Sequence, residues 1–231
     1  GEELFQVTSD VRYKKLLIDT ANLIKRRGPD EPHWPLNQNF AAEDFFMSAA
    51  VLGRAFKMTG SEHYINLLLE FITTAGTQEE NGLFPHNRFG PFHWGRGNGF
   101  ASLGLAESLT YIPESHPKRD LILNMYTKLM KALKPLQEPS GMYRQLIDFP
   151  GAYHEFTSTS MIGYSMTRGI RLGWIDNSSG NKLDDAIGNE QAFVPDTDPV
   201  SNSIMKKQIS SFIIRDLQHH RNLISLFERI F

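Results

Sequence analysis

Apolar residues recur every three to four positions over most of the first 175 residues, and this spacing predicts helices. Strand-like alternation is nearly absent, so the pattern predicts an all-α chain. Gly60 and Ser61 supply a stop signal for one helix and a cap for the next. The predicted helices span residues 11–27, 42–60, 61–76, 98–111, 117–134 and 156–172.

The predicted helices alternate in character along the chain. Amphipathic helices are followed by helices rich in Ala, Gly, Ser and Met. The connecting loops also resemble one another, because "NGLFPH" from Asn81 and "SGMYRQ" from Ser140 place Gly82 and Gly141 59 residues apart. A repeat of this length is typical of stacked helical hairpins. We therefore expect an (α/α) toroid with the small-residue helices inside and the amphipathic helices outside.

The toroid is expected to be partial. About three hairpins precede residue 175, whereas a closed (α/α)6 barrel has six. From residue 177 the sequence becomes polar and rich in turn residues, and helical periodicity returns at 204–231. We predict a barrel-like domain at 1–176, a linker at 177–203 and one or two packing helices at 204–231.

Composition narrows the possible partners. The chain has 231 residues, a net charge of −2, 40% hydrophobic residues and no cysteine. This charge argues against nucleic acid or an anionic membrane as partner, and the lack of cysteine excludes thiolate metal sites and cysteine nucleophiles. No run approaches the roughly 18 apolar residues of a membrane span. The start shows no signal-peptide pattern, which gives only a slight preference for the cytoplasm.

The segment "GPFHWGRGNGF", residues 90–100, is the strongest candidate for chemistry. A phosphate-binding loop would follow a strand or carry Lys-Ser or Lys-Thr, and this segment does neither. The glycines alone are explained by close helix packing, but Trp94 and Arg96 are not. A sugar-binding rim accounts for both, because Trp94 offers a flat face to a pyranose ring. His86, Arg88, His93 and Arg96 would make the rim positive and suited to a carboxylated sugar.

No acidic residue lies between Glu80 and Glu107, so we expect nothing to oppose an anion at this rim. The positive end of a helix that begins near Asn98 would add to the attraction.

A family resemblance runs roughly from residue 10 to 176, and three motifs carry it: "AEDFFM" (42–47), "HWGRGNGF" (93–100) and "GMYRQLIDFPGAYHEFTSTSMIGYSMTRGIRLGWI" (141–175). In these the chain resembles glycoside hydrolase family 105, the unsaturated rhamnogalacturonyl hydrolases, which are related to the family 88 unsaturated glucuronyl hydrolases. The resemblance implies an (α/α)6 barrel, no metal and no cofactor. It also implies hydration of the C4–C5 double bond of a terminal unsaturated uronic acid in an oligosaccharide.

That chemistry requires a carboxylic acid that protonates C4 and a base that guides water to C5. Asp44 matches the family's aspartate at the start of an inner helix. The family's second aspartate falls in the loop that here reads "FPHNRFGPFH", which has no carboxylate. We therefore expect Asp44 to act with help from His86 or His93, in an enzyme that is impaired. Glu43 is expected to be solvated or capping.

Several further residues are candidates for substrate binding. Glu155 has an alternative role as a cap shared with Thr157, and Trp34 sits between prolines that equally favour a rigid surface loop. His219 and His220 face different ways on a helix, so they make a weak metal pair. The expected substrate contacts are Trp34, Arg88, Trp94, Arg96, Asn98, Tyr143, Arg144, Gln145, Tyr153 and Glu155.

A partial toroid would also expose the flanks of its inner helices. We expect exposed apolar side chains at Phe45, Phe46, Val51 and Leu52 on one flank and at Met161, Ile162 and Met166 on the other. Cover by the tail, a homodimer or truncation of a longer chain would each explain such a surface. Two functional alternatives stay open: a non-catalytic or vestigial sugar-binding relative, and an α/α-toroid sugar isomerase.

Overall fold

The computed structural model describes residues 2–28 and 31–176 and divides the chain into two compact units. The first unit comprises residues 1–138 and 142–181. The second comprises 139–141 and 182–231, of which only the turn 139–141 is described. The predicted linker at 177–203 and the predicted helices at 204–231 lie outside the described residues, so the proposed domain boundary stays a prediction.

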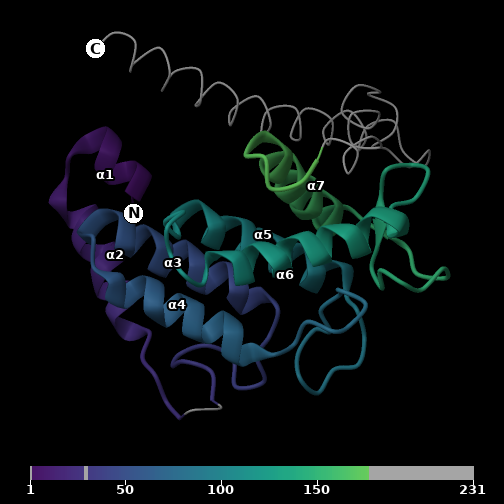
Figure 1. Ribbon diagram of the computed structural model, residues 1–231, viewed down its shortest axis with the longest axis horizontal. Coiled ribbons are helices and arrows are strands. Elements are labelled where there is room, and N and C mark those ends of the chain that lie inside the picture. The colour runs from purple at the N-terminus through teal and green to yellow at the C-terminus, as the bar shows by residue number, and fades with distance from the viewer. Residues whose placement is uncertain (1, 29–30, 177–231) are drawn as a thin grey trace, which may run out of the picture. The chain divides into compact units, whose positions relative to one another are not determined.

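The described part of the chain is almost entirely helical (Figure 1). Two short strands, β1 (Tyr143–Arg144) and β2 (His154–Glu155), pair antiparallel with Tyr143 opposite Glu155. Because these two short strands are the only sheet in the described residues, the all-α prediction is confirmed. The helices are α1 (Glu2–Thr8), α2 (Val11–Leu23), α3 (Glu43–Thr59), α4 (Glu62–Ala75), α5 (Gly95–Tyr111), α6 (Arg119–Leu133), the short 3-10 helix η1 (Lys134–Leu136) and α7 (Phe156–Arg171).

All six predicted helices are present, with differences at two ends. The predicted helix 11–27 stops at Leu23, because Lys25 leaves the helix to pair with Trp34 through backbone hydrogen bonds of 2.9 and 2.8 Å. Helix α5 begins at Gly95, three residues earlier than predicted, after Trp94 in an extended conformation. Helix α1 was not predicted.

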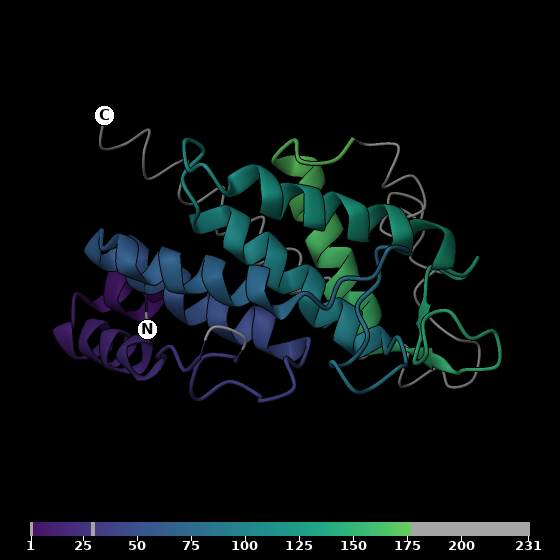
Figure 2. The same ribbon diagram turned by 60° about the horizontal axis from the view of Figure 1, so that its bottom comes forward.

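The helices form two layers within this unit. The inner helices α3, α5 and α7 pack side by side, with α5 in the middle. Helix α4 lies against α3 and α6 lies against α5 as the outer layer (Figures 1 and 2). The layers follow the predicted division into small-residue and amphipathic helices.

Contact between backbones explains why the inner helices are rich in glycine. A Cβ atom on Gly104 of α5 would stand 2.4 Å from the carbonyl carbon of Phe45 and 2.6 Å from the nitrogen of Phe46, both in α3. On the other side of α5, Ser165 of α7 donates its hydroxyl to the carbonyl of Ser102 at 2.9 Å. Small residues on α5 therefore set the spacing of all three inner helices.

The 59-residue repeat of the sequence is a repeat of hydrogen bonds in the structure. The amide of Glu79 donates to the carbonyl of Leu83 at 3.0 Å, and the amide of Glu138 donates to that of Met142 at the same distance. Gly82 and Gly141 have φ angles of 93° and 81°, which favour glycine. The two loops therefore leave their outer helices by the same turn.

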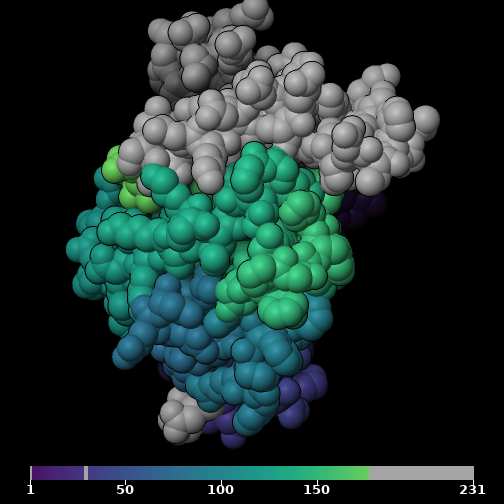
Figure 3. Space-filling view, turned by 90° about the vertical axis from the view of Figure 1, so that its right-hand side faces the viewer, coloured from purple at the N-terminus to yellow at the C-terminus, as the bar shows by residue number. Residues whose placement is uncertain are grey.

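Three loops meet at the N-terminal ends of the inner helices, and we call residues 31–42, 77–94 and 142–155 the mouth loops. Ala42 donates its amide to the carbonyl of His86, Gly95 donates to Gln145, and Ile147 donates to His93. In Figure 3 the blue-teal second loop lies against the green third loop. Backbone hydrogen bonds thus join all three loops into one surface.

His93 clamps the second mouth loop to the third. Its Nδ1 lies 2.6 Å from Asp148 Oδ2 and its Nε2 lies 2.9 Å from Glu79 Oε2, while only 11% of the side chain is exposed. Burial lowers the pKa of His93, but the hydrogen bonds and charges of Asp148 and Glu79 outweigh it, so the pKa lies above its ordinary value. With a carboxylate at each nitrogen, His93 acts as a charged bridge.

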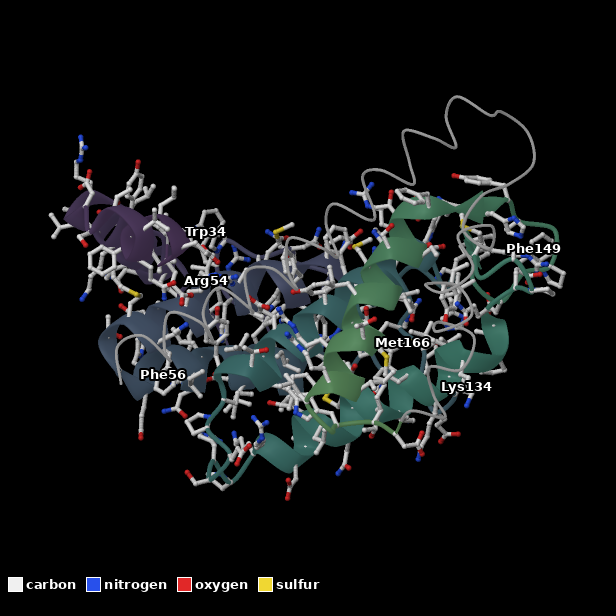
Figure 4. All side chains as sticks on the ribbon, turned by 90° about the horizontal axis from the view of Figure 1, so that it is seen from above. Trp34, Arg54, Phe56, Lys134, Phe149 and Met166 are labelled. Atoms are coloured by element: carbon white, nitrogen blue, oxygen red, sulfur yellow. The ribbon has the colours of Figure 1, made fainter. Side chains whose placement is uncertain are left out.

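The opposite ends of the inner helices are held by a second ionic cluster, which we call the base network. Glu107 of α5 bridges Arg54 of α3 and Arg168 of α7, the latter at 2.6 Å. Arg54 also pairs with Glu3 of α1 at 3.2 Å, and Figure 4 shows it beside that purple helix. One charged side chain from each inner helix therefore joins the three helices in a line.

The expected apolar flanks are not exposed as a set. Phe45, Leu52 and Ile162 are fully buried, and Met161 and Met166 are 9% and 2% exposed. Phe45 packs against Phe71 and Phe84, with ring centroids 5.7 and 5.3 Å away. The prediction of contiguous exposed flanks at these positions is wrong, because these side chains are buried. The homodimer that rested on those flanks stays a prediction.

Gly104→Ala is expected to destabilise the fold by about 1–3 kcal/mol, because its Cβ would overlap backbone atoms that cannot turn aside. Gly97→Ala is the matched control in the same helix, where the nearest atoms would lie 3.6 to 3.8 Å away. Urea unfolding followed by circular dichroism measures both. Equal stability of the two variants would contradict the close contact between α3 and α5.

The raised pKa of His93 predicts that the protein loses stability as pH rises. Its raised pKa means that its contribution is fully present below the unfolded value of about 6.5 and is lost as pH rises through the higher folded value. The free energy of unfolding should therefore fall across this interval in the wild type. In Asp148→Asn the fall should be smaller, and an unchanged slope would show that the clamp is not protonated in the folded protein.

Candidate functional site

Asp44 occupies the first turn of α3, where the three mouth loops meet. The amide of Asn37 in the first loop donates to Asp44 Oδ2 at 2.6 Å. Burial raises the pKa of Asp44, the Asn37 hydrogen bond lowers it, and the charge of Glu43 raises it again, so the pKa lies above its ordinary value. Such a carboxyl group keeps its proton to higher pH than a solvated aspartate, as a general acid requires.

Glu43 stands next to Asp44 and faces the second mouth loop. Its Oε1 accepts a hydrogen bond from His86 Nε2 at 3.2 Å, and its Oε2 is buried with no hydrogen-bond partner among the described residues. Glu43 was expected to be solvated or capping, but its carboxylate instead bonds His86, and only 24% of the side chain is exposed.

His86 is held on both sides of its ring. Besides Glu43 at Nε2, it contacts Asn87 Nδ2 through Nδ1 at 3.1 Å. Its ring meets that of Trp94 edge to face, with centroids 6.5 Å apart. His86 therefore connects the carboxylates of α3 to the tryptophan at the start of α5.

Trp94 and Arg96 flank the start of α5, as the sugar-binding interpretation expects. Trp94 is 36% exposed. The Arg96 guanidinium lies 5.6 Å from the centroid of Phe100, whose ring in turn lies 6.2 Å from that of Phe46 on α3. Among the described residues Arg96 has no carboxylate or carbonyl partner, so its charge is available to an anion.

The other expected cations of the rim are already engaged. Arg88 donates to the carbonyls of Thr74 and Ala75 at the end of α4 and stacks 3.8 Å from the ring centroid of Phe40. The positive charge of His93 is compensated by the carboxylates of Glu79 and Asp148. The expectation that nothing opposes an anion here is therefore wrong, because Glu43, Glu79 and Asp148 reach the rim from other parts of the chain.

Two expected substrate contacts are buried, and we reassign them to the fold. The Asn98 amide is fully buried and bonds both the amide and the carbonyl of Phe84, each at 2.9 Å. Tyr143 is also fully buried, and burial raises the pKa of its hydroxyl. Neither side chain has surface left for a sugar.

The remaining candidates of the third mouth loop divide between structure and surface. Glu155 caps α7 by accepting from the amides of Thr157 and Ser158, which supports the capping alternative. Arg144 pairs with Glu138 at 3.0 Å. Tyr153 is 66% exposed, and the amide of Gln145 donates to its carbonyl at 2.9 Å. Tyr153 and Gln145 stay candidates for substrate contact.

Trp34 belongs to the first mouth loop and is 54% exposed. Its ring lies 4.8 Å from the guanidinium of Arg27, and its backbone pairs with Lys25. The structure gives no contact between Trp34 and the group around Asp44.

Sequence patterns missed Glu43, Glu79 and Asp148, since all three approach the histidines from distant parts of the chain. Only the neighbouring pair Glu43–Asp44 in an apolar run offered a signal. The described residues contain no group of three or more His, Asp or Glu arranged to hold a metal ion. None of the described helices is long and apolar enough to cross a membrane.

Comparison with known proteins gives relatives with related activities. The chain is 31% identical over 86 residues to the unsaturated rhamnogalacturonyl hydrolase YesR of Bacillus subtilis, covering 37% of this chain and 25% of the relative. It is 28% identical over 85 residues to an unsaturated 3S-rhamnoglycuronyl hydrolase of Alteromonas, covering 36% and 21%.

A solved structure shows the same fold. A family 105 glycoside hydrolase from C. acetobutylicum superposes with a TM-score of 0.68 at 22% identity, covering 82% of this chain and 58% of that one. The chain therefore spans little more than half of that solved relative and aligns with about a quarter or less of the two hydrolases. This coverage agrees with a partial (α/α) toroid.

The model of Glycosyl Hydrolase Family 88 matches residues 3–189, which is most of the chain and includes all three motifs of the resemblance. The motifs, the helical layers and this match agree, and the chain belongs to Glycosyl Hydrolase Family 88.

Proposed function

We propose that this chain provides the catalytic half of an unsaturated uronyl hydrolase. Asp44 carries the proposal, because it is a half-buried carboxyl group with a raised pKa in the first turn of an inner helix. Asp44 Oδ2 is occupied by the amide of Asn37, and Oδ1 makes no hydrogen bond to the described residues. Oδ1 is therefore the oxygen from which Asp44 can transfer a proton.

The reaction is an addition of water across a carbon–carbon double bond. Asp44 transfers its proton to C4 of the terminal 4,5-unsaturated uronic acid, and positive charge develops at C5. A water molecule adds its oxygen to C5 and returns a proton to the Asp44 carboxylate. The C5 hemiketal then opens, and the neighbouring sugar is released.

Arg96 and Trp94 provide recognition in this proposal. The guanidinium binds the carboxylate of the uronic acid, and the indole face covers the apolar side of the ring. The two relatives named above are, by name, an unsaturated rhamnogalacturonyl hydrolase and an unsaturated 3S-rhamnoglycuronyl hydrolase. We therefore place a rhamnose next to the unsaturated sugar.

The proposal predicts loss of the double-bond absorbance when the protein is mixed with lyase-digested rhamnogalacturonan. Lyase-digested ulvan and glycosaminoglycan fragments test the sugar class. Asp44→Asn should lower kcat by about two to four powers of ten, because the amide cannot donate an acidic proton. Its melting temperature should not fall, since asparagine keeps the acceptor for Asn37 and removes a costly buried carboxyl. No decay on any substrate by folded wild-type protein would overturn the enzyme proposal and favour a vestigial binding protein.

Arg96→Gln should raise KM by about tenfold to a hundredfold, the loss of one charge-assisted hydrogen bond. The effect on kcat should be smaller, because the guanidinium contacts the carboxylate before and after protonation. Steady-state kinetics on the same fragments measure the two constants. Arg88→Gln is the comparison, since Arg88 is held at the end of α4, and an equal rise in its KM would contradict the assignment of Arg96 as the carboxylate anchor.

A further inference from the structure

Phe40 of the first mouth loop has a left-handed backbone conformation, which a bulky aromatic residue rarely adopts. Its φ angle is 54°, and Ser9, with 56°, is the other described residue besides the glycines that has a positive φ. This conformation is unfavourable for any residue with a Cβ atom, and it persists only where the surrounding structure imposes it. The contacts of Phe40 must therefore offset its cost.

The ring of Phe40 is fixed by α4 and by the second mouth loop. It is 1% exposed and stacks on the ring of Phe71 in α4, with centroids 6.0 Å apart. The guanidinium of Arg88 lies 3.8 Å from its centroid. Arg88 is itself held by carbonyls at the end of α4, and its backbone amide donates to the carbonyl of Asn39 at 2.9 Å. Burial of the ring and the cation–π contact therefore stabilise the left-handed conformation.

Phe40 lies where the first mouth loop folds back onto α3. The amide of Phe40 donates to the carbonyl of Asn37 at 3.1 Å, and the amide of Asn39 donates to Asn37 Oδ1 at 2.8 Å. These two hydrogen bonds close a turn. The amide of Asn37 then donates to Asp44 Oδ2, seven positions further along the chain, at 2.6 Å. Since Phe40 lies between the two, its backbone conformation determines whether the Asn37 amide reaches Asp44.

Phe71 connects the same turn to the helix that carries Asp44. Besides Phe40, its ring contacts that of Phe45 in α3, with centroids 5.7 Å apart. Phe45 follows Asp44 directly in the sequence and is fully buried. One side chain of α4 therefore aligns both partners of the Asn37–Asp44 hydrogen bond.

We propose that Phe40 is a positioning residue of the reaction, because its fixed left-handed conformation presents the Asn37 amide to Asp44 Oδ2 and leaves Oδ1 for the substrate. This inference rests on the proposed role of Asp44 as the acid. A carboxyl group with one oxygen engaged is held in one orientation, so the oxygen that faces the substrate is selected before the substrate binds. Arg88, which was expected to contact the substrate, acts through the ring of Phe40 instead.

The Asn37 amide also contributes during proton transfer. When Asp44 gives up its proton, this hydrogen bond becomes charge-assisted, and such bonds are stronger than those between neutral groups. An interaction that strengthens as the proton leaves stabilises the transition state more than the bound substrate. Loss of the turn at Phe40 should therefore lower kcat and leave KM nearly unchanged.

Two variants separate the backbone conformation from the ring. Phe40→Ala and Phe40→Gly both remove the ring, but glycine adopts a positive φ without strain and alanine does not. In Phe40→Ala, kcat should fall about tenfold to a hundredfold, as for a misplaced catalytic group, with little change in KM. In Phe40→Gly the fall in kcat should be smaller. Equal kcat values in the two variants would contradict the role of the left-handed conformation.

Ser9 offers the matched control. It has nearly the same φ as Phe40, but it is exposed and lies between α1 and α2. Ser9→Ala and Ser9→Gly should therefore have equal kcat values. NMR observes the hydrogen bond itself, because the Asn37 amide should exchange slowly with solvent in the wild type. This protection should be lost in Phe40→Ala and partly kept in Phe40→Gly.

A purely structural role of Phe40 would lower the melting temperature of Phe40→Ala but leave kcat and the Asn37 amide unchanged, and this result would overturn the inference. The exchange measurement does not need turnover. An inactive wild type would therefore contradict the proposed function alone, while the Asn37 amide would still decide whether Phe40 positions Asp44. If neither Phe40 variant folds, the surface change Arg88→Gln decides: kcat and the protection of the Asn37 amide should both fall, and no change in either would overturn the inference.

Discussion

The close approach of α5 to α3 is the constraint on which the rest of the structure depends. With no side chain at Gly104, the backbones of the two helices touch. That contact sets the third turn of α5 against the first turn of α3. At the start of α5, His86 connects the two helices, because it bonds Glu43 and meets the ring of Trp94. The absence of a Cβ atom at Gly104 therefore sets the spacing of the two helices that carry the site.

The two histidines of the mouth show how neighbours determine the chemistry of one residue type. Both were expected to make the rim positive and to assist Asp44. His93 lies between carboxylates of two loops and serves as a charged bridge. His86 lies between the side-chain amide of Asn87 and the carboxylate of Glu43, and connects its loop to α3. Partners from distant segments of the chain make the difference.

The sequence predicted the helices from α2 to α7, their two layers and the repeat, because periodicity and loop glycines are local signals. Motifs of a known family also pointed to Asp44, Trp94 and Arg96 as site residues, and their roles stay a prediction. It could not place Glu79 or Asp148 beside His93, since those contacts join residues 14 and 55 positions away. Nor could it show that Asn98 and Tyr143 turn inward, because burial of a polar residue depends on packing.

The base network gives the molecule two ends that respond differently to their surroundings. At the base, arginine stays charged throughout the neutral range, and Glu107 holds two arginines from its two neighbouring helices. At the mouth, the bridge between loops depends on the imidazole of His93, which loses its charge once the pH passes its raised pKa. A rise in pH can therefore weaken the bridge between the mouth loops, while the base network still joins the inner helices.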